Sequence, residues 1–576
     1  MTEKNNDLNK PTQRKKIRFE RKQIIVGSGI LVLALAGIFT GVFLINIIQP
    51  IEKKTFSYGV GYNPFAPDPV LAGFAYDGVS VHIINQITEG LFTTEFVGSS
   101  SRIAFNLAES ADWSDDNLNF TCSLRHNVWF HDGSPFNAYA VKWNIDRLHR
   151  LYDAYGLGDY LFQFPDGEWI INNTIVLDDY TIRFVLERPF SPLPALLSSQ
   201  FANILRPNAT LENDFIDPIS KKLCGTGPFK FDSFEENNSV TLLPNSKYWN
   251  GPNYVLDRII FRIFYPNDTL GIEALKNEDI SMIYNSYYNE HIESLKDVPG
   301  ITVRKFTTPF SNVLDMNNKY INSTMRKAIS YAFNYSHFIN EVRNNGEERM
   351  RSPIPEIIRY SNYEDLDVPY CNISLARQTL IDANWNGTMG LLANNDISSD
   401  NPWKLKANST FPLATYNYSY IWNWDALVML YEPLADYLSQ IGVKVNANPC
   451  SYAEFYGRIR GIWGYERTFN LYITGWNPDY NEPSSVITPL YSNSSIDNSA
   501  NVNDTQLQAM IEQSIEETNE SKREQIFFNI QERIIEELYP SLWLYFDVKY
   551  DAYVSNLRNV PIPHYIKFSF KDIYFA

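Results

Sequence analysis

The hydrophobic and polar positions divide the chain into two unequal parts. Residues 24–48 (IIVGSGILVLALAGIFTGVFLINII) contain no ionisable side chain. A helix rises about 1.5 Å per residue, so this run exceeds the hydrocarbon core of about 30 Å and predicts a transmembrane helix that spans with some tilt. From residue 56 onward no comparable run occurs.

Beyond residue 56, short strand-like and helix-like patterns alternate. Residues 181–187 (TIRFVLE) and 257–264 (DRIIFRIF) are rich in β-branched and aromatic side chains and predict strands. Residues 137–148 and 521–538 carry apolar side chains at helical spacing, the first with Asn137 as a possible cap, and predict helices. This mixture indicates an α/β fold rather than a helix bundle or a sandwich.

The charges separate the same two parts. Residues 1–23 carry eight basic and three acidic side chains, a net +5, within a formal net charge of −17, which leaves −22 for the rest. Basic residues gather on the cytoplasmic side of a membrane helix, so we expect a cytoplasmic N-terminus and an extracellular body. A cleaved signal peptide is the alternative, but the run is longer than a signal h-region and no small-residue cleavage site follows it. Nucleic-acid phosphates would repel so acidic a body, and we expect no nucleic-acid partner.

An extracellular location agrees with the N-x-[ST] sequons, all of which follow the apolar run. We expect some of them to be glycosylated. The fourteen asparagines are Asn119, Asn172, Asn208, Asn237, Asn267, Asn322, Asn334, Asn372, Asn386, Asn408, Asn417, Asn493, Asn503 and Asn519.

Four cysteines lie in the same part of the chain, without a C-x-x-C pair. Disulfides are permitted outside the cell, and four cysteines allow three connectivities. We favour Cys371–Cys450 together with Cys122–Cys224, and four buried free thiols are the alternative.

The chain lacks the common motifs of catalysis. It contains no H-E-x-x-H, no G-x-x-x-x-G-K-[ST], no G-x-G-x-x-G and no G-x-S-x-G. His126 and His131 are five residues apart, but a zinc site needs three or four ligands. Glycosidase carboxylates leave no local signature, so an enzyme is not excluded by motif alone. We expect no catalytic residue, no metal and no cofactor.

Five segments together resemble one protein family. In order and at family spacing, they are similar to motifs of the family 5 extracellular solute-binding proteins, the oligopeptide- and dipeptide-binding components of ABC importers. The resemblance extends from about residue 56 to the C-terminus. The segments are 87–94 (ITEGLFTT), 119–148, 225–231 (GTGPFKF) with 242–251 (LLPNSKYWNG), 325–334 (MRKAISYAFN) and 475–483 (GWNPDYNEP).

Most of these motifs indicate scaffold rather than ligand contacts. In residues 130–136 (FHDGSPF), Asp132 and Gly133 predict a turn. In residues 225–229 (GTGPF), the glycines are expected to adopt φ values closed to other residues.

The resemblance implies an α/β, periplasmic-binding-protein-like type II clamp with two main lobes and an extra subdomain, preceded by the transmembrane helix. Hinge crossings are expected near residues 309–313 and 544–548. The boundaries are a cytoplasmic stub 1–23, the helix 24–48, a linker 49–55 and a solute-binding domain 56–576, with lobe I about 56–92, 221–305 and 546–576, subdomain Ib about 93–220, and lobe II about 306–545.

The resemblance also implies two groups of ligand-binding residues. Asp479 matches the acid that pairs with the α-amino group of a bound peptide, and Trp476 and Tyr480 supply flat apolar walls beside it. The alternative is that Asp479 is a turn acid in a Pro-rich loop. Tyr76, Asp77 and Gly78 match a stretch that gives backbone hydrogen bonds to an extended peptide.

Departures from the family pattern leave the ligand open. Gly464 and Ile473 stand where relatives that bind longer peptides have basic residues, although Arg458, Arg460 and Arg467 lie nearby. Peptide is favoured over oligosaccharide. The expected partners are that ligand and the membrane subunits of an ABC permease, with the protein itself a monomer anchored by its own helix. A ligand-sensing receptor, a secreted hydrolase and a structural surface-layer protein are the alternatives from other classes.

Overall fold

The computed structural model describes residues 54–576 apart from 73–76, 98–99, 156–160, 217–218, 252–255, 265–266, 285–288, 345, 362–363 and 563–567. The cytoplasmic stub, the transmembrane helix and most of the linker predicted from the sequence lie outside the described residues. Within this described part of the chain, no helix combines the length and the apolar composition that crossing a bilayer requires.

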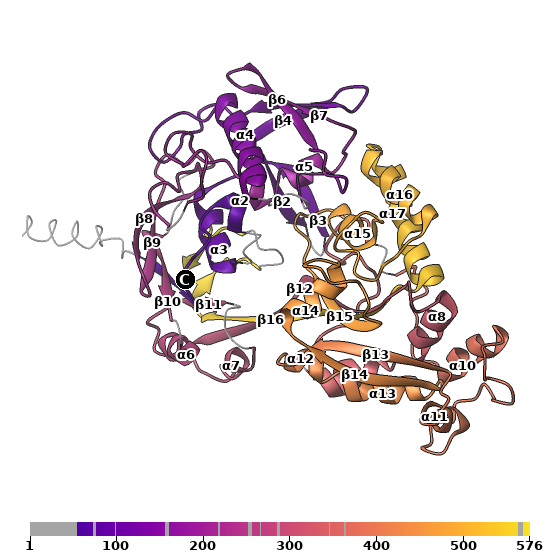
Figure 1. Cartoon of the computed structure of the whole chain (residues 1–576). Coiled ribbons are helices and arrows are strands. Elements are labelled where there is room, and N and C mark those ends of the chain that lie inside the picture. Colours follow the sequence, from indigo (N-terminus) through magenta and orange to yellow (C-terminus); the bar gives the residue numbers. More distant parts are fainter. Residues whose placement is uncertain are drawn as a thin grey trace, which may run out of the picture. The chain divides into compact units, whose positions relative to one another are not determined.

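One large mixed sheet extends through the described body (Figure 1). Its ten strands lie in the order β14-β13-β15-β12-β16-β11-β1-β10-β9-β8. In that order they are Val443–Cys450, Ala414–Ile421, Leu471–Trp476, Ile301–Met316, Ser541–Val554, Met282–Tyr284, Thr55–Val60, Arg258–Ile263, Ser239–Pro244 and Phe229–Glu235.

The two longest strands, β12 and β16, lie side by side in the middle of this sheet. They pair antiparallel from Ile301 opposite Val554 to Asp315 opposite Ser541, with register shifts between Thr307 and Ser311 and between Asn312 and Val313. Such irregularities bend a strand and increase its twist. The bend falls where the sequence predicts the first hinge crossing, in residues 309–313; that these strands act as a hinge stays a prediction.

A second sheet of four antiparallel strands is built from residues between β1 and β8. Its order is β4-β5-β7-β6, and two small two-stranded sheets accompany it. The strands are β4 Ala108–Trp113, β5 Asn119–Leu124, β7 Thr181–Leu186 and β6 Ile171–Asp178, then β2 Phe92–Val97 with β3 Ser100–Phe105, and β17 Leu557–Arg558 with β18 Tyr574–Phe575.

Helices connect and cover these strands, as α13 does along β14 (Figure 1). They are α2 Pro69–Ala72, α3 Gly78–Ile87, α4 Ala138–Tyr155, α5 Leu193–Leu196, α6 Asp268–Lys276, α7 Asn289–Glu293, α8 Ser323–Ala332, α9 Tyr335–His337, α10 Ile373–Asp382, α11 Pro402–Ala407, α12 Asp425–Val428, α13 Tyr431–Ser439, α14 Tyr452–Arg460, α15 Ser484–Tyr491, α16 Thr505–Glu516 and α17 Glu520–Glu532. A 3₁₀ turn covers Gln200–Ala202, and π-helical turns cover Phe338–Arg343 and Arg533–Leu538.

The elements predicted from periodicity are confirmed. The two strand patterns form β7 and β10, and the two helix patterns form α4 and α17, the second continued by the π-helical turn. Asn137 accepts a hydrogen bond from the Ala140 N–H at 3.1 Å, as a cap does.

Several sequon asparagines have a structural role as helix caps. Their side-chain oxygens accept hydrogen bonds from backbone N–H groups in the first turns of α6, α8, α9, α10 and α17. Helix capping accounts for an asparagine at each of these positions. Glycosylation of the sequons stays an expectation. The residues concerned are Asn267, Asn322, Asn334, Asn372 and Asn519.

The expected disulfides are not formed, and this part of the sequence interpretation is corrected. All four cysteines are free thiols. Cys122 lies in β5 with its side chain fully buried in a hydrophobic cluster, and burial raises the pKa of its thiol. Cys450 ends β14 and its Sγ donates to the Tyr420 carbonyl, whereas Cys371 is exposed. Cys371 and Cys450 therefore lie in different environments, one exposed and one buried. The alternative of four buried free thiols is also wrong, because Cys371 is exposed.

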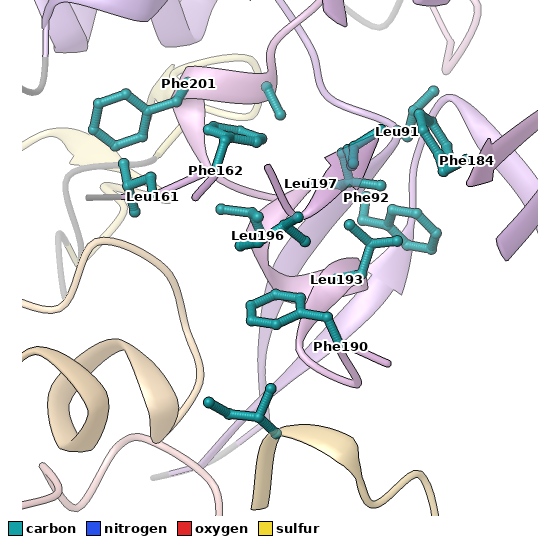
Figure 2. Close-up of a cluster of buried hydrophobic side chains, with 14 of the residues drawn as sticks. Leu91, Phe92, Leu161, Phe162, Phe184, Phe190, Leu193, Leu196, Leu197 and Phe201 are labelled. Atoms are coloured by element: carbon teal, nitrogen blue, oxygen red, sulfur yellow. The ribbon is translucent and has the colours of Figure 1, made fainter. Parts of the chain in front are cut away.

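Three hydrophobic clusters form the described core. One lies around β1 and β10, and a second lies around β13 and β14. The third joins the four-stranded sheet and α4 to side chains of α15, α16 and α17. Figure 2 shows part of this third cluster, with Leu193 of α5 beside Phe190. Segments more than 300 residues apart in the sequence therefore share one core.

One buried carboxylate joins three of the family-like motifs. Glu89 accepts hydrogen bonds from Thr226 Oγ1 at 2.7 Å, the Tyr248 hydroxyl at 2.9 Å and Trp249 Nε1 at 3.0 Å. Glu89 belongs to ITEGLF, Thr226 to GTGPF and the two aromatics to KYWNG. A buried carboxylate needs such partners, so these contacts hold the three segments together as scaffold.

The glycines of GTGPF serve a purpose other than the one predicted. Neither Gly225 nor Gly227 has a positive φ. A Cβ on Gly225 would lie 2.3 Å from the Ile87 carbonyl oxygen, and one on Gly227 would lie 2.7 Å from the Ile87 carbonyl carbon. Close approach of two backbones, not backbone conformation, therefore requires glycine here.

We expect Gly225→Ala to lower the free energy of unfolding by about 1–3 kcal/mol, because the added methyl forces two backbones apart. Urea unfolding followed by circular dichroism measures this change. Gly78→Ala is the matched control, since its Cβ would lie 3.7 Å from the nearest atom, the Tyr62 hydroxyl, and the residue begins a helix. Equal stability of both variants and the wild type would contradict the prediction.

Candidate functional site

The loop after β15 carries the residues that the sequence singles out most strongly. Gly475 pairs with Asn312 of β12, and a Cβ there would lie 2.4 Å from the Phe310 ring. Glycine thus lets β15 approach β12 closely just before the chain turns. Trp476, Asp479 and Tyr480 follow at the end of this strand.

Hydrogen bonds fix the shape of this loop. Trp476 Nε1 donates to the Ser485 carbonyl at 2.8 Å, and the Tyr480 hydroxyl lies 3.1 Å from Ser484 Oγ. Glu482 accepts from the Ser484 N–H at 2.6 Å and forms a buried ion pair with Arg523 of α17. The aromatic walls are therefore held in place before any ligand arrives.

This loop forms one side of a cavity of about 160 Å³. Trp476, Asp479 and Tyr480 all line it, so the structure brings the three predicted residues together. The other lining residues are Leu161, Gln163, Phe164, Pro165, Ile170, Phe190, Ser484, Ser485, Thr488, Pro489, Ser494, Ser495, Ile496, Asp497 and Ile515. The cavity lies between the segment 161–190 and the segment 476–515.

Asp479 is the most unusual ionisable group of the cavity. Burial, and after it the charge of Asp497, raise the pKa of Asp479 to about 7. Within the described residues, no hydrogen-bond donor contacts the Asp479 carboxylate. A carboxylate without donors in a partly dry site favours a cationic ligand or a proton.

The neighbouring acid, Asp497, is already paired. Its Oδ1 lies 2.8 Å from Arg460 Nη2, and its side chain is 4% exposed. Tyr152 of α4 lies close enough that the Asp479 charge, after burial, raises the pKa of its hydroxyl. No Lys, Arg or His is among the described residues that line the cavity.

The second predicted group does not join this cavity. The Asp77 carboxylate caps α3, accepting the Ser80 N–H at 3.1 Å and the N–H groups of Phe65 and Ala66 at 2.8 Å each. Its carbonyl accepts the Val81 N–H within the helix. Gly78 begins that helix, and Tyr76 lies outside the described residues. A ligand-binding role for Tyr76, Asp77 and Gly78 stays a prediction.

The three arginines near the motif are all engaged elsewhere. Arg467 donates to the carbonyls of Asn498 and Ile496, both at 2.8 Å. Arg458 pairs with Glu454 at 2.9 Å. With Arg460 paired to Asp497, none of them offers its guanidinium to a ligand carboxylate in this conformation.

Sequence reasoning missed the far wall of the cavity. Phe164, Phe190 and Ile515 come from segments without a recognisable pattern, and only tertiary packing brings them to Asp479. The two histidines five residues apart have separate contacts: His126 lies against the Tyr180 ring, and His131 Nε2 lies 2.9 Å from the Gly227 carbonyl oxygen. Among the residues that the structure describes, no group of three or more His, Cys, Asp or Glu could hold a metal ion.

Comparison with known proteins identifies the family. The model of the bacterial extracellular solute-binding proteins, family 5 (middle region), matches residues 102–498. The chain belongs to this family, as the ordered motifs indicate. It is a solute-binding protein of the ABC-transporter type and not an enzyme.

The individual relatives have low sequence identity to this chain, and their names refer to different ligands. The chain is 25% identical over 506 residues to heme-binding protein A of Haemophilus influenzae, covering 83% of this chain and 85% of that protein. It is 25% identical over 470 residues to glutathione-binding protein GsiB of Pectobacterium atrosepticum, covering 80% and 83%.

Solved structures confirm the α/β, periplasmic-binding-protein-like fold. The periplasmic binding protein DppA of Helicobacter pylori, solved with the peptide STSA, superposes with a TM-score of 0.65 at 23% identity. The similarity covers 91% of this chain and 98% of that one.

The raised pKa of Asp479 predicts how pH affects the ligand-free protein. Its value is about 7 in the folded state, against about 3.9 for an ordinary Asp in the unfolded chain. Between those values the folded state binds more protons, so the free energy of unfolding falls as pH rises from about 4 to 7. Asp479→Asn removes this loss and should be more stable than the wild type at pH 8 by ~1–2 kcal/mol, allowing for partial exposure.

Urea unfolding at pH 5 and pH 8 measures this difference. At pH 5 the difference should be clearly smaller than at pH 8, because the folded-state carboxyl is still protonated and only part of the loss between pH 4 and 7 has occurred. Asp400→Asn, at an exposed carboxyl, is the control and should change stability at neither pH. An Asp479→Asn protein less stable than wild type at pH 8 would contradict the assignment.

Proposed function

We propose that this protein captures peptides by their free amino terminus, with Asp479 as the counter-ion of the ammonium group. The observation that supports this most directly is the Asp479 carboxylate, which lines a cavity, receives no hydrogen bond from the described part of the chain and lies in a loop matching the family motif. An ammonium replaces the missing donors and restores the charged form of the acid.

The surroundings of Asp479 favour a cation further. Trp476 and Tyr480 present aromatic rings to the same cavity, and rings of this kind attract an ammonium that has lost its water. The names of the compared relatives include peptide, glutathione and heme binders, so the family alone leaves the ligand class open. The acid, rather than the aromatic residues that would also suit a sugar, decides our choice of peptide.

Delivery to an ABC permease is the second part of the proposal. Ligand contacts from both lobes favour the closed conformation, so binding shifts the population toward it. We assign the hinge to β12 and β16, which alone run the full length between the two halves of the large sheet among the described strands. The closed form then docks on the permease subunits, and the cytoplasmic ATPases of the importer power uptake.

We also propose that residues 24–48 anchor the protein in the cell membrane. Their lack of ionisable side chains and the basic residues before them support a single span with the N-terminus inside. The anchor keeps the binding domain beside the permease at the outer face.

Ligand capture tests the main proposal. Full-length protein purified in detergent is denatured, and mass spectrometry of the released small molecules should find peptides with free amino termini. Asp479→Asn should weaken the binding of the recovered peptide by tenfold or more, the loss of about 1.5–3 kcal/mol for a charged hydrogen bond. N-acetylation of the peptide should have the same effect, whereas Asp400→Asn should have none.

Recovery of an oligosaccharide in place of peptides would overturn the proposal. So would unchanged peptide affinity in Asp479→Asn. Turnover of the peptide during incubation would point to a hydrolase and contradict a pure binding role.

Membrane fractionation tests the anchor. The full chain should stay with membranes after washes in high salt and at high pH, because a hydrophobic span is insensitive to ionic strength. A chain that lacks residues 1–48 should be released. Release of the full chain by salt alone would contradict anchoring.

A further inference from the structure

The cavity at Asp479 has a second, apolar side that the charge argument does not use. Opposite the loop after β15 stand side chains from the segment 161–190 and from the end of α16. They share low exposure, at most 9% each, and belong to one hydrophobic cluster. They are Leu161, Phe164, Ile170, Phe190 and Ile515.

This apolar side is held rigidly. The rings of Phe164 and Phe190 meet edge to face, with centroids 5.8 Å apart and an interplanar angle of 82°. The Arg188 guanidinium covers the Phe164 ring at 3.9 Å. Figure 2 shows Phe190 packed beside Leu193 of α5.

A backbone hydrogen bond holds the two parts of the apolar side together. The Ser191 N–H donates to the Ile515 carbonyl at 2.7 Å, next to Phe190. The segment 161–190 and the end of α16 therefore form one continuous apolar wall of the cavity.

The size of the cavity matches one residue. A dry cavity of about 150 Å³ accepts a benzene molecule, and this one has about 160 Å³. An acid on one side and aromatic and aliphatic carbons on the other suit a group that is cationic at one end and apolar at the other. Because Asp479 and Asp497 are the charged lining residues, an anionic side chain would meet repulsion.

We propose that this cavity receives the whole first residue of the peptide and selects large apolar side chains there. The ammonium lies on Asp479, and the side chain of a leucine, isoleucine, methionine or phenylalanine lies against Phe164, Phe190 and Ile515. This inference rests on the proposed function and adds the selectivity for the first residue. It makes the protein a receptor for peptides with apolar amino termini.

A peptide panel tests the selectivity. Full-length protein in detergent is titrated with two series of peptides, the tripeptides X-Ala-Ala and hexapeptides in which X is followed by five alanines. The first residue X is Gly, Leu, Phe or Asp, and binding is followed by calorimetry. Burial of a Leu or Phe side chain predicts affinity about ten- to a hundredfold above that of the Gly peptides. The Asp peptides should bind most weakly.

Variants of the apolar wall localise the effect. Phe190→Ala should reduce the preference for Leu and Phe over Gly by about tenfold while changing the Gly peptides little. Phe190→Leu keeps the site apolar and guards against misfolding; it should retain the preference for Leu and weaken that for Phe. Phe411→Ala, at a ring that is 76% exposed, is the matched control and should leave the panel unchanged.

The outcomes separate this inference from the proposed function. If all free-amine peptides bind within twofold of one another and N-acetylated Leu-Ala-Ala does not bind, the selectivity is wrong and the role of Asp479 stands. If the N-acetylated peptide binds as tightly as the free amine, the proposed function fails and this inference fails with it. Binding by no member of the panel contradicts both.

Discussion

The antiparallel pairing of β12 with β16 connects the two halves of the large sheet, and the strands on either side are placed by pairing outward from it. At one end these strands bury Ile301 and Val554 among the side chains around β1; at the other, Leu314 and Leu542 lie among those around β13. The buried Asp315 carboxylate accepts hydroxyl groups of Ser541 at 2.6 Å and Thr474 at 2.7 Å. One acid thus ties β12 to both of its neighbours, and loss of these hydroxyl groups would leave a buried carboxyl without hydrogen-bond partners.

The binding loop depends on this arrangement. Asp315 also accepts the Ser499 hydroxyl at 2.5 Å, and Ser499 follows the cavity residues 494–497. Trp476 ends β15, whose position is set by its pairing with β12. Asp479 is consequently placed by the same strands that would bend during closure. A change in their twist would move the acid relative to the apolar wall, so under the proposed function ligand capture and the conformation of the sheet would be coupled.

The motif residues divide into scaffold and site once their contacts are known. Glu89, Thr226 and the pair Tyr248–Trp249 serve a buried hydrogen-bond network, although they are as distinctive in the sequence as GWNPDYNEP. Asp77 is similar: its resemblance suggested ligand binding, and the structure uses its carboxylate to cap α3 and to hold residues 65 and 66. Asp479 differs because its carboxylate receives no donor from the described residues. A motif draws attention to a residue, and its hydrogen-bond partners show whether it serves the scaffold or is available to a ligand.

The amino-acid sequence by itself determined the α/β class, the helices α4 and α17, the strands β7 and β10 and the family, and it singled out Asp479 as a candidate ligand-binding residue. These rest on periodicity and on ordered motifs, which are local properties of the chain. The tertiary structure decided that the cysteines stay unpaired, that the glycines of GTGPF allow close backbone approach, and that Phe164, Phe190 and Ile515 face Asp479. Such contacts join segments hundreds of residues apart. Their energies depend on which groups are buried and which polar groups are paired, and a local sequence pattern does not contain this information.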